Sequence, residues 1–354
     1  MTRAQQPETA GVRGSQALGS PWQSGETCLS GLSNQARRAR LGVPAPTSGE
    51  VSARAGQRDR LADVARGAVG QPVVAGTAPA ATLPKCFDLR DVRGRDFVTP
   101  VRDQGDSGAS VSFGVIAALE TTAAYVRGVP GLNLDLAEAH HTGERVGAVF
   151  AAAAREGVTF EDYFPYGAAE PDPDWPDRAA RPTGVTDLTG DPVAIKRHLF
   201  SYGAVAATML VADDFFDYTG GVYTSDEPGT AGHCVALVGW DDPAGCWIAK
   251  NSWGTGWGEA GFCRIAYGDS HIESYPGPHA SVMGCTDVRI RAWLPAQRVL
   301  RGFAAANDTT GWAYLENLGW SRVPGGLLVE LGRAGGGPVR PHVTYDGHID
   351  RLRL

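Results

Sequence analysis

The chain has 354 residues, a hydrophobic fraction of 43%, a charged fraction of 20% and a formal net charge of −7. The first two fractions are ordinary for globular proteins, which excludes a wholly disordered or fibrous chain. The acidic balance argues against a nucleic-acid or membrane partner, and no apolar run reaches the length of about 18 residues that a transmembrane helix needs.

The N-terminal segment differs in composition from the rest of the chain. Residues 1–80 contain a single aromatic residue, Trp22, among Gly, Ala, Arg, Gln, Ser and Pro. Such a segment buries too little apolar surface to offset its ordering entropy, so we expect residues 1–80 to be disordered. Apolar residues at helical spacing over 61–68 allow a short helix there, and a transient linker helix is the favoured alternative. No signal peptide is visible, which favours a cytoplasmic protein and leaves export by another route open.

Helical patterns begin after residue 83, where the apolar content rises. A glycine-rich loop opens an apolar run with a 3.6-residue period, which predicts a buried helix over 110–126. Further helical patterns cover 136–141, 144–157 and 191–202, the last beginning with a favourable Asp-Pro pair.

After Gly203 the apolar period falls to two. The runs AVAATMLV, GHCVALVGW, CWIAKNSW and GFCRIAY predict strands of an antiparallel sheet. Because the helical part precedes the sheet part, we expect an α+β fold with a helical lobe and a β lobe over residues 81–285. Short alternating runs predict a small β-rich module over 286–354.

Three blocks of the central region form a recognisable set. They are VTPVRDQGDSGASVSFGVIAALE (98–120), GHCVALVGWDD (232–242) and CWIAKNSWGTGWGEAGFCRI (246–265). In this order they resemble the active-site blocks of the papain-like cysteine peptidases, and the resemblance extends over about residues 83–285. It implies the papain-like two-lobe fold, hydrolysis of peptide bonds and a peptide or protein substrate, with no cofactor and no metal.

The residue types within these blocks fit hydrolytic chemistry. Ser110 begins a helix, whose N-terminal N–H groups favour developing negative charge, and Gln104 is suited to donate to an oxyanion beside the backbone N–H of Ser110. His233 opens a strand and is suited to act as general base, while Asn251 is suited to orient the imidazole. The resemblance gives Trp253 the role of shielding the Asn–His hydrogen bond from water.

The nucleophile position departs from the family pattern. Ser110 stands where the family has its catalytic cysteine, and Ser107 stands where it has a disulfide-forming cysteine. The pKa of a thiol, about 8.5, can be lowered until a thiolate forms, but the pKa of a serine hydroxyl is many units higher. Ser110 is therefore expected to lose its proton during attack, as in a serine hydrolase.

Structural roles compete with several of these assignments. A serine at a helix start is often a cap, and Cys234 is expected to be a small core residue. His140-His141 has no ligand spacing typical of a metal site, so we expect a solvated helix end there. Six cysteines do not make a disulfide scaffold, and a bridge between Cys86 and Cys285 stays open.

Substrate binding is expected to involve the glycines next to the catalytic positions, Gly108 and Gly232. The Cys-Asn-Gly-Gly element that lines part of the family's cleft is missing, which puts recognition along that wall in doubt. The absence of a helical pro-segment argues against a secreted zymogen of the usual kind.

Three hypotheses for the function remain open. The first is a hydrolase that cleaves peptide or ester bonds weakly through Ser110, His233 and Asn251, with Gln104 in the oxyanion hole. The second is an inactive pseudo-peptidase that binds peptides. The third is an active cysteine peptidase trapped by a Cys-to-Ser change. The presence of the complete supporting set favours a working or recently working site, and the oligomeric state stays undetermined.

Overall fold

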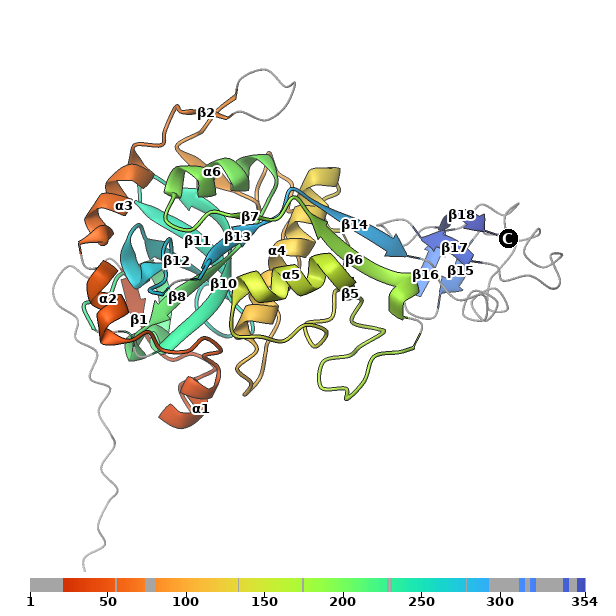
Figure 1. The fold of residues 1–354 in the computed structure, drawn as a ribbon, viewed down its shortest axis with the longest axis horizontal. Coiled ribbons are helices and arrows are strands. Elements are labelled where there is room, and N and C mark those ends of the chain that lie inside the picture. The colour runs from red at the N-terminus through yellow and green to blue at the C-terminus, as the bar shows by residue number, and fades with distance from the viewer. Residues whose placement is uncertain are drawn as a thin grey trace, which may run out of the picture.

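A computed structural model describes residues 22–54, 56–73, 81–132, 134–173, 175–227, 229, 231–277, 279–292, 312–315, 319–322, 340–343 and 349–353. Its helices are α1 (Asn34–Ala39), α2 (Ser48–Arg54), α3 (Gln57–Arg66), α4 (Ser110–Arg127), α5 (Val146–Glu156) and α6 (Pro192–Ser201). Figure 1 shows these helices around a twisted sheet, with the N-terminal helices α1 to α3 at one end of the molecule.

The main sheet carries the second and third motif blocks. Its strand order is β1-β9-β12-β11-β10-β8-β13-β7, with β4 paired to β10. Its members are β1 (Trp22–Ser24), β4 (Cys86–Asp88), β7 (Thr186–Asp187), β8 (Val205–Val211), β9 (Tyr218–Tyr223), β10 (Ala231–Asp241), β11 (Cys246–Lys250), β12 (Phe262–Ala266) and β13 (Val282–Gly284). The predicted strands are confirmed as β8, β10, β11 and β12, and their pairings are antiparallel. The pairing of β12 with β9 is parallel.

Helix α4 forms the core of the helical lobe and packs against β10, β8 and α5. Every residue from Ser110 to Ala124 is buried, because partners cover the helix on more than one face. This confirms the predicted buried helix, and α5 and α6 confirm two of the other helical patterns. The fold is thus α+β, with a helical lobe beside an antiparallel β lobe.

Residues 136–141 do not form the predicted helix. Leu136 makes an isolated bridge with Phe160, and the backbone N–H of Ala137 donates to the carbonyl of Thr159 at 2.9 Å. A six-residue pattern is too short to repay helix nucleation when the backbone has other partners.

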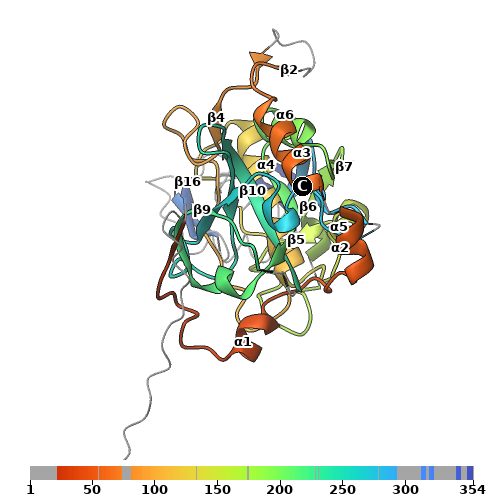
Figure 2. The ribbon, with the colours of Figure 1, turned by 90° about the vertical axis from the view of Figure 1, so that its left-hand side faces the viewer.

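The expectation of a disordered N-terminal segment is wrong for residues 22–54 and 56–73. They contain α1, α2, α3 and the strands β1 and β2 (Pro72–Val73), and Figure 2 shows them running along one side of the molecule. The apolar surface that orders them belongs to the rest of the chain, since Trp22 lies against Tyr223 with ring centroids 5.1 Å apart. Residues 1–21 and 74–80 lie outside the described part.

Charged contacts fix this segment on both sides of residues 40–43. Before them, Arg38 pairs with Asp213 at 2.5 Å. After them, Arg58 pairs with the buried Asp269 at 2.6 Å. The segment is therefore anchored at two separate places on the β lobe.

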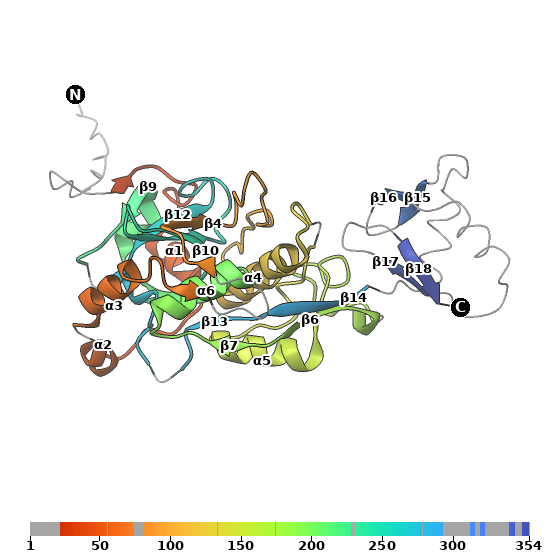
Figure 3. The ribbon, with the colours of Figure 1, turned by 90° about the horizontal axis from the view of Figure 1, so that it is seen from above.

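Further strands lie toward the C-terminus. Strand β14 (Asp287–Ala292) pairs with β6 (Arg178–Thr183), which pairs with β5 (Val158–Thr159), and Figure 3 shows β6 and β14 side by side. Beyond them the described residues form β15 (Trp312–Leu315) paired with β16 (Gly319–Arg322), and β17 (Arg340–Val343) paired with β18 (Ile349–Arg353). Near the N-terminal segment β2 pairs with β3 (Ala81–Thr82). Much of 286–354 lies outside the described residues, so the β-rich module stays a prediction.

The six cysteines are all free, so Cys86 and Cys285 are not bridged in this structure. Cys86 is exposed at the start of β4, whereas Cys285 is buried. Within the described ranges, no helix combines the length and apolarity that crossing a membrane requires.

Candidate active site

The N-terminus of α4 meets the strand that carries His233. Ser110 is the first residue of α4, and its Oγ accepts a hydrogen bond from the backbone N–H of Cys234 at 3.3 Å. Because Cys234 follows His233 in β10, the hydroxyl lies beside the strand segment that bears the imidazole. The structural alternative of a capping serine does not apply to Ser110, since the N-cap is Ala109 and the Ser110 side chain bonds outside its own helix.

His233 and Asn251 form a buried pair. The Nε2 of His233 donates to Oδ1 of Asn251 at 2.7 Å, because an amide oxygen can only accept. Burial lowers the pKa of His233 to about 4, against the opposing effects of Asn251 and of the Arg40 backbone. At neutral pH the imidazole is therefore uncharged, with its proton on Nε2 and its lone pair on Nδ1. This Nδ1 has no hydrogen-bond partner in the described part of the chain.

Trp253 covers the His–Asn pair. Its ring lies 4.6 Å from that of His233, and its side chain is fully buried. On its other sides Trp253 stacks on Phe216 at 5.2 Å and meets Trp257 edge-on at 5.0 Å. The indole therefore excludes water from the hydrogen bond that orients the imidazole.

Gln104 is held by the loop that follows Asn251. Its backbone N–H donates to the carbonyl of Ser252 at 2.9 Å, and its Oε1 accepts from the Ser252 hydroxyl at 2.7 Å. Since the amide oxygen is occupied in this way, Nε2 is the end that is left to donate. It donates to the carbonyls of Arg40 at 2.9 Å and of Ser107 at 2.5 Å.

Residues 40–43 of the N-terminal segment lie across this site. The carbonyl oxygen of Arg40 accepts a hydrogen bond from the side-chain amide of Gln104, and the backbone N–H of Gly42 donates to Oγ of Ser110 at 3.3 Å. Val43 exchanges two backbone hydrogen bonds with Gly232, at 3.0 and 3.1 Å. The chain thus covers the predicted nucleophile, the predicted oxyanion donor and the start of the histidine strand.

Gly42 is the point of closest approach in this segment. A Cβ added there would lie 1.9 Å from the carbonyl oxygen of Gly108 and 2.8 Å from Oγ of Ser110. Both distances are below any van der Waals contact, so only glycine fits. Gly108 and Gly232, predicted to support substrate binding, are therefore the backbone surfaces that face the segment.

Two further predictions have clear outcomes. Cys234 is a buried core residue as expected, and burial raises the pKa of its thiol to about 12. His140 and His141 do not form a solvated helix end, because their rings stack at 4.4 Å and Thr159 donates its backbone N–H to Nδ1 of His140 at 2.9 Å. No group of three or more metal-ligating side chains occurs among the described residues.

The sequence prediction missed the residues that lie over the cleft. Helix N-capping motifs lie before and after these residues in the sequence. Ser33 caps α1 by accepting from the N–H of Ala36. Thr47 and Glu50 form a capping box at α2, with reciprocal side-chain to backbone hydrogen bonds of 3.2 and 2.8 Å. These caps predict helices in a segment that contains almost no aromatic residues.

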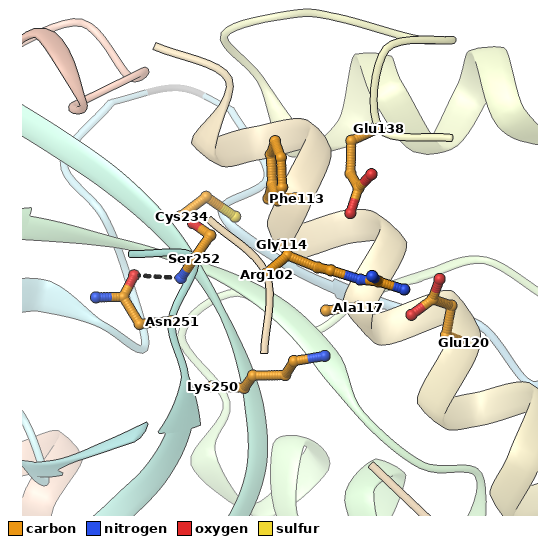
Figure 4. A pocket seen from close by; sticks show the side chains of 10 residues that line it. All are labelled: Arg102, Phe113, Gly114, Ala117, Glu120, Glu138, Cys234, Lys250, Asn251 and Ser252. Carbon is orange, nitrogen blue, oxygen red and sulfur yellow. Dashed lines mark hydrogen bonds between the residues drawn. The ribbon is translucent and has the colours of Figure 1, made fainter. Parts of the chain in front are cut away.

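A buried charge cluster lies behind the site, next to α4. In Figure 4 four side chains from different parts of the chain point toward one another: Arg102, Glu120, Glu138 and Lys250. Thr99 links two of them, since its hydroxyl donates to Glu120 at 2.6 Å and receives a bond from Lys250 at 3.0 Å. Burial raises the pKa of Glu138 to about 8, and the nearby Glu120 adds to the shift. Because Lys250 directly precedes Asn251, the cluster fixes the strand end that carries the amide.

Comparison with known proteins places this arrangement in a family. Mouse Pro-cathepsin H is 30% identical over 227 residues, covering 57% of this chain and 67% of that protein. Cysteine proteinase 2 of Entamoeba histolytica is 30% identical over 195 residues, covering 49% of this chain and 62% of that protein. The chain thus spans about two thirds of the length of these curated relatives.

Solved structures share the fold. The digestive procathepsin L 3 of Tenebrio molitor larval midgut matches with a TM-score of 0.56 at 21% identity, covering 75% of this chain and 83% of that one. The proCathepsin B S9 of Trypanosoma congolense matches with a TM-score of 0.55 at 18% identity, covering 75% and 92%. The model of the papain family of cysteine proteases matches residues 83–277, more than half of the chain. By its sequence, and in keeping with its fold, this chain belongs to the papain family of cysteine proteases.

Proposed function

We propose that the chain is a papain-type hydrolase of peptide or ester bonds, with Ser110 as nucleophile and His233 as general base. The observation that carries this proposal is the orientation of His233. Its Nε2–H is committed to Asn251 at 2.7 Å, and its Nδ1 is left without a partner. An uncharged imidazole with a free lone pair is what a serine hydroxyl needs in order to lose its proton during attack.

In this mechanism Oγ of Ser110 bonds to the substrate carbonyl carbon while its proton passes to Nδ1 of His233. The carbonyl oxygen becomes an oxyanion, which accepts from Nε2 of Gln104 and from the N–H of Ser110 at the N-terminus of α4. His233 then gives the proton to the leaving amine or alcohol as its bond to carbon breaks. Water, deprotonated in turn by His233, hydrolyses the acyl ester and restores Ser110.

The serine at this position sets the expected rate. In the closed structure burial holds the pKa of His233 at about 4, so a thiolate–imidazolium pair at this site would need residues 40–43 to leave first. Once the site is open, a thiol loses its proton far more readily than a serine hydroxyl. An oxyanion donor contributes about 10²–10³-fold in rate whichever atom attacks. We therefore expect slow turnover by Ser110 and faster turnover by a Ser110→Cys variant in the same site.

Residues 40–43 are proposed to keep this site closed until the segment leaves. Their backbone takes the hydrogen bonds that a substrate needs from Gln104, Ser110 and Gly232. The solved structures named above are of a procathepsin L 3 and a proCathepsin B. Their match covers 75% of this chain, which is more than residues 83–277 account for, and this supports a pro-segment role for the N-terminal helices.

The test is turnover of unspecific peptide and ester substrates by the full chain carrying Gly42→Ala, which opens the cleft. We expect slow, measurable hydrolysis that His233→Ala abolishes and that Ser110→Cys increases. Activity of the Ser110→Cys chain alone would instead favour a trapped cysteine peptidase or a pseudo-peptidase. No turnover by either chain would refute the proposed function.

A further inference from the structure

The guanidinium of Arg40 occupies a site made by the loop between Gln104 and Ser110. Its Nη1 lies 2.9 Å from Oδ1 of Asp103, and its Nη2 lies 3.2 Å from Oδ1 of Asp106. The Arg40 side chain is only 9% exposed, although the two carboxylates are 51% and 70% exposed. The arginine is thus enclosed, and the aspartates form the rim that receives its charge.

Contacts other than those with Arg40 also position the rim. Asp103 also accepts the backbone N–H of Gly105 at 2.9 Å, and its backbone bridges to Trp253. The neighbouring Arg102 does not neutralise it, because Arg102 pairs with Asp135 at 2.5 Å. Among the described residues, Arg40 is the ion-pair partner of both aspartates.

The guanidinium site formed by Asp103 and Asp106 lies next to the proposed oxyanion hole. The same residue that puts its guanidinium between Asp103 and Asp106 puts its carbonyl oxygen on Nε2 of Gln104. A residue whose carbonyl lies in the oxyanion hole adjoins the scissile bond. When residues 40–43 leave, the two carboxylates remain beside the position that a substrate's scissile residue takes.

We propose that Asp103 and Asp106 form a subsite that binds the side chain of an arginine adjoining the scissile bond of a peptide. This inference rests on the proposed function, because it assigns a substrate preference to the same cleft. The paired carboxylates match the two terminal nitrogens of a guanidinium, and a neutral side chain of the same shape loses both ion pairs. Lysine carries its charge on one nitrogen and lacks the two separate nitrogens that here meet one carboxylate each.

The binding test uses the full chain with Gly42→Ala and needs no catalysis. The probe is a fluorescein-labelled octapeptide copying residues 39–46, compared with a twin that has citrulline in place of arginine. Fluorescence anisotropy should show the arginine peptide binding about 10-fold more tightly, since two partly exposed ion pairs are lost in the twin. Asp103→Asn with Asp106→Asn should abolish this difference.

A matched control separates a subsite from a simple clamp on the N-terminal segment. Asp213 pairs with Arg38 of the same segment but lies outside the cleft, so Asp213→Asn loosens the segment and should keep the 10-fold preference. A preference that survives the loss of Asp103 and Asp106, or equal binding of both peptides, overturns the proposal. If hydrogen exchange of the residue 40–43 amides shows that the segment stays in place in the Gly42→Ala chain, Gly42→Trp is used instead of Gly42→Ala in every experiment.

A turnover arm distinguishes this inference from the proposed function. In the Ser110→Cys, Gly42→Ala chain, peptides with arginine before the scissile bond should be cleaved faster than their citrulline twins, and the two aspartate substitutions should remove the difference. Absence of all turnover with the binding preference intact refutes the proposed function alone. Turnover without any preference for arginine refutes the subsite alone.

Discussion

Gly42→Ala should open the cleft without unfolding the protein. The new Cβ would lie 1.9 Å from the backbone carbonyl oxygen of Gly108 and 2.8 Å from the side-chain Oγ of Ser110, so residues 40–43 cannot keep their place. Residues 40–43 would then lose their hydrogen bonds to Gln104, Ser110 and Gly232.

The magnitude follows from these bonds. The backbone of residues 40–43 makes four hydrogen bonds in the cleft, one with Gln104, one with Ser110 and two with Gly232, in addition to the two ion pairs of the Arg40 side chain. At about 1 kcal/mol net for each bond, their loss shifts the closed–open equilibrium by up to about 4 kcal/mol, or roughly 10³-fold. The ion pairs at Arg38 and Arg58 lie outside the cleft, so the segment should stay attached at both ends.

Hydrogen exchange measures this change directly. The amides of Gly42 and Val43 should exchange up to about 10³-fold faster in Gly42→Ala, while amides in the middle of α4 keep their protection. Gly49→Ala is the matched control, because a Cβ there meets only Oγ1 of Thr47, at 4.0 Å. Unchanged exchange at Gly42 and Val43, or equal effects of the two substitutions, would refute the account of the closed cleft.

Further predictions concern pH and stability. Burial in the closed structure lowers the pKa of His233 from about 6.5 to about 4, so proton uptake favours the open state. The protection of the residue 40–43 amides should therefore fall as the pH drops from 6.5 to 4, by at most about 3 kcal/mol. His233→Gln should lessen this pH dependence in the same exchange experiment. Trp253→Ala removes a fully buried indole and should lower the free energy of unfolding by about 3–5 kcal/mol in urea titration. Glu120→Leu removes the carboxylate that most raises the pKa of the buried Lys250 and should lower the free energy of unfolding by about 3–5 kcal/mol, most of which a second change, Lys250→Met, should restore.

The sequence predicted those helices and strands that carry a long apolar period of their own. The buried helix that begins at Ser110 and the strands that carry His233 and Asn251 have long apolar periods, and the structure has them where they were expected. The six-residue pattern at 136–141 failed, because its backbone is bound by Thr159 and Glu120 instead of by a helix.

The N-terminal segment could not be predicted from its own composition. Leu61 and Ala65 are buried in α3, but the surfaces that bury the segment belong to distant residues, 64 positions away where Arg40 meets Gln104 and 131 where Ala65 meets Lys196. Trp22 pairs with Tyr223 in the same way. Composition measures only the apolar surface that a segment brings, so it underestimates the order of a segment that a larger partner covers. The occupied cleft is a consequence of that long-range packing, and no sequence motif at Arg40 or Gly42 predicts it.

The most direct test of the proposed nucleophile is covalent labelling of Ser110. A fluorophosphonate probe reacts with a serine whose proton a neighbouring base removes, and mass spectrometry locates the adduct. In the Gly42→Ala chain we predict labelling at Ser110 that is faster than in the Gly49→Ala control and absent after His233→Ala. Failure of Ser110 to react in a chain whose residue 40–43 amides exchange freely would contradict the assignment of Ser110, His233 and Asn251 as a working triad.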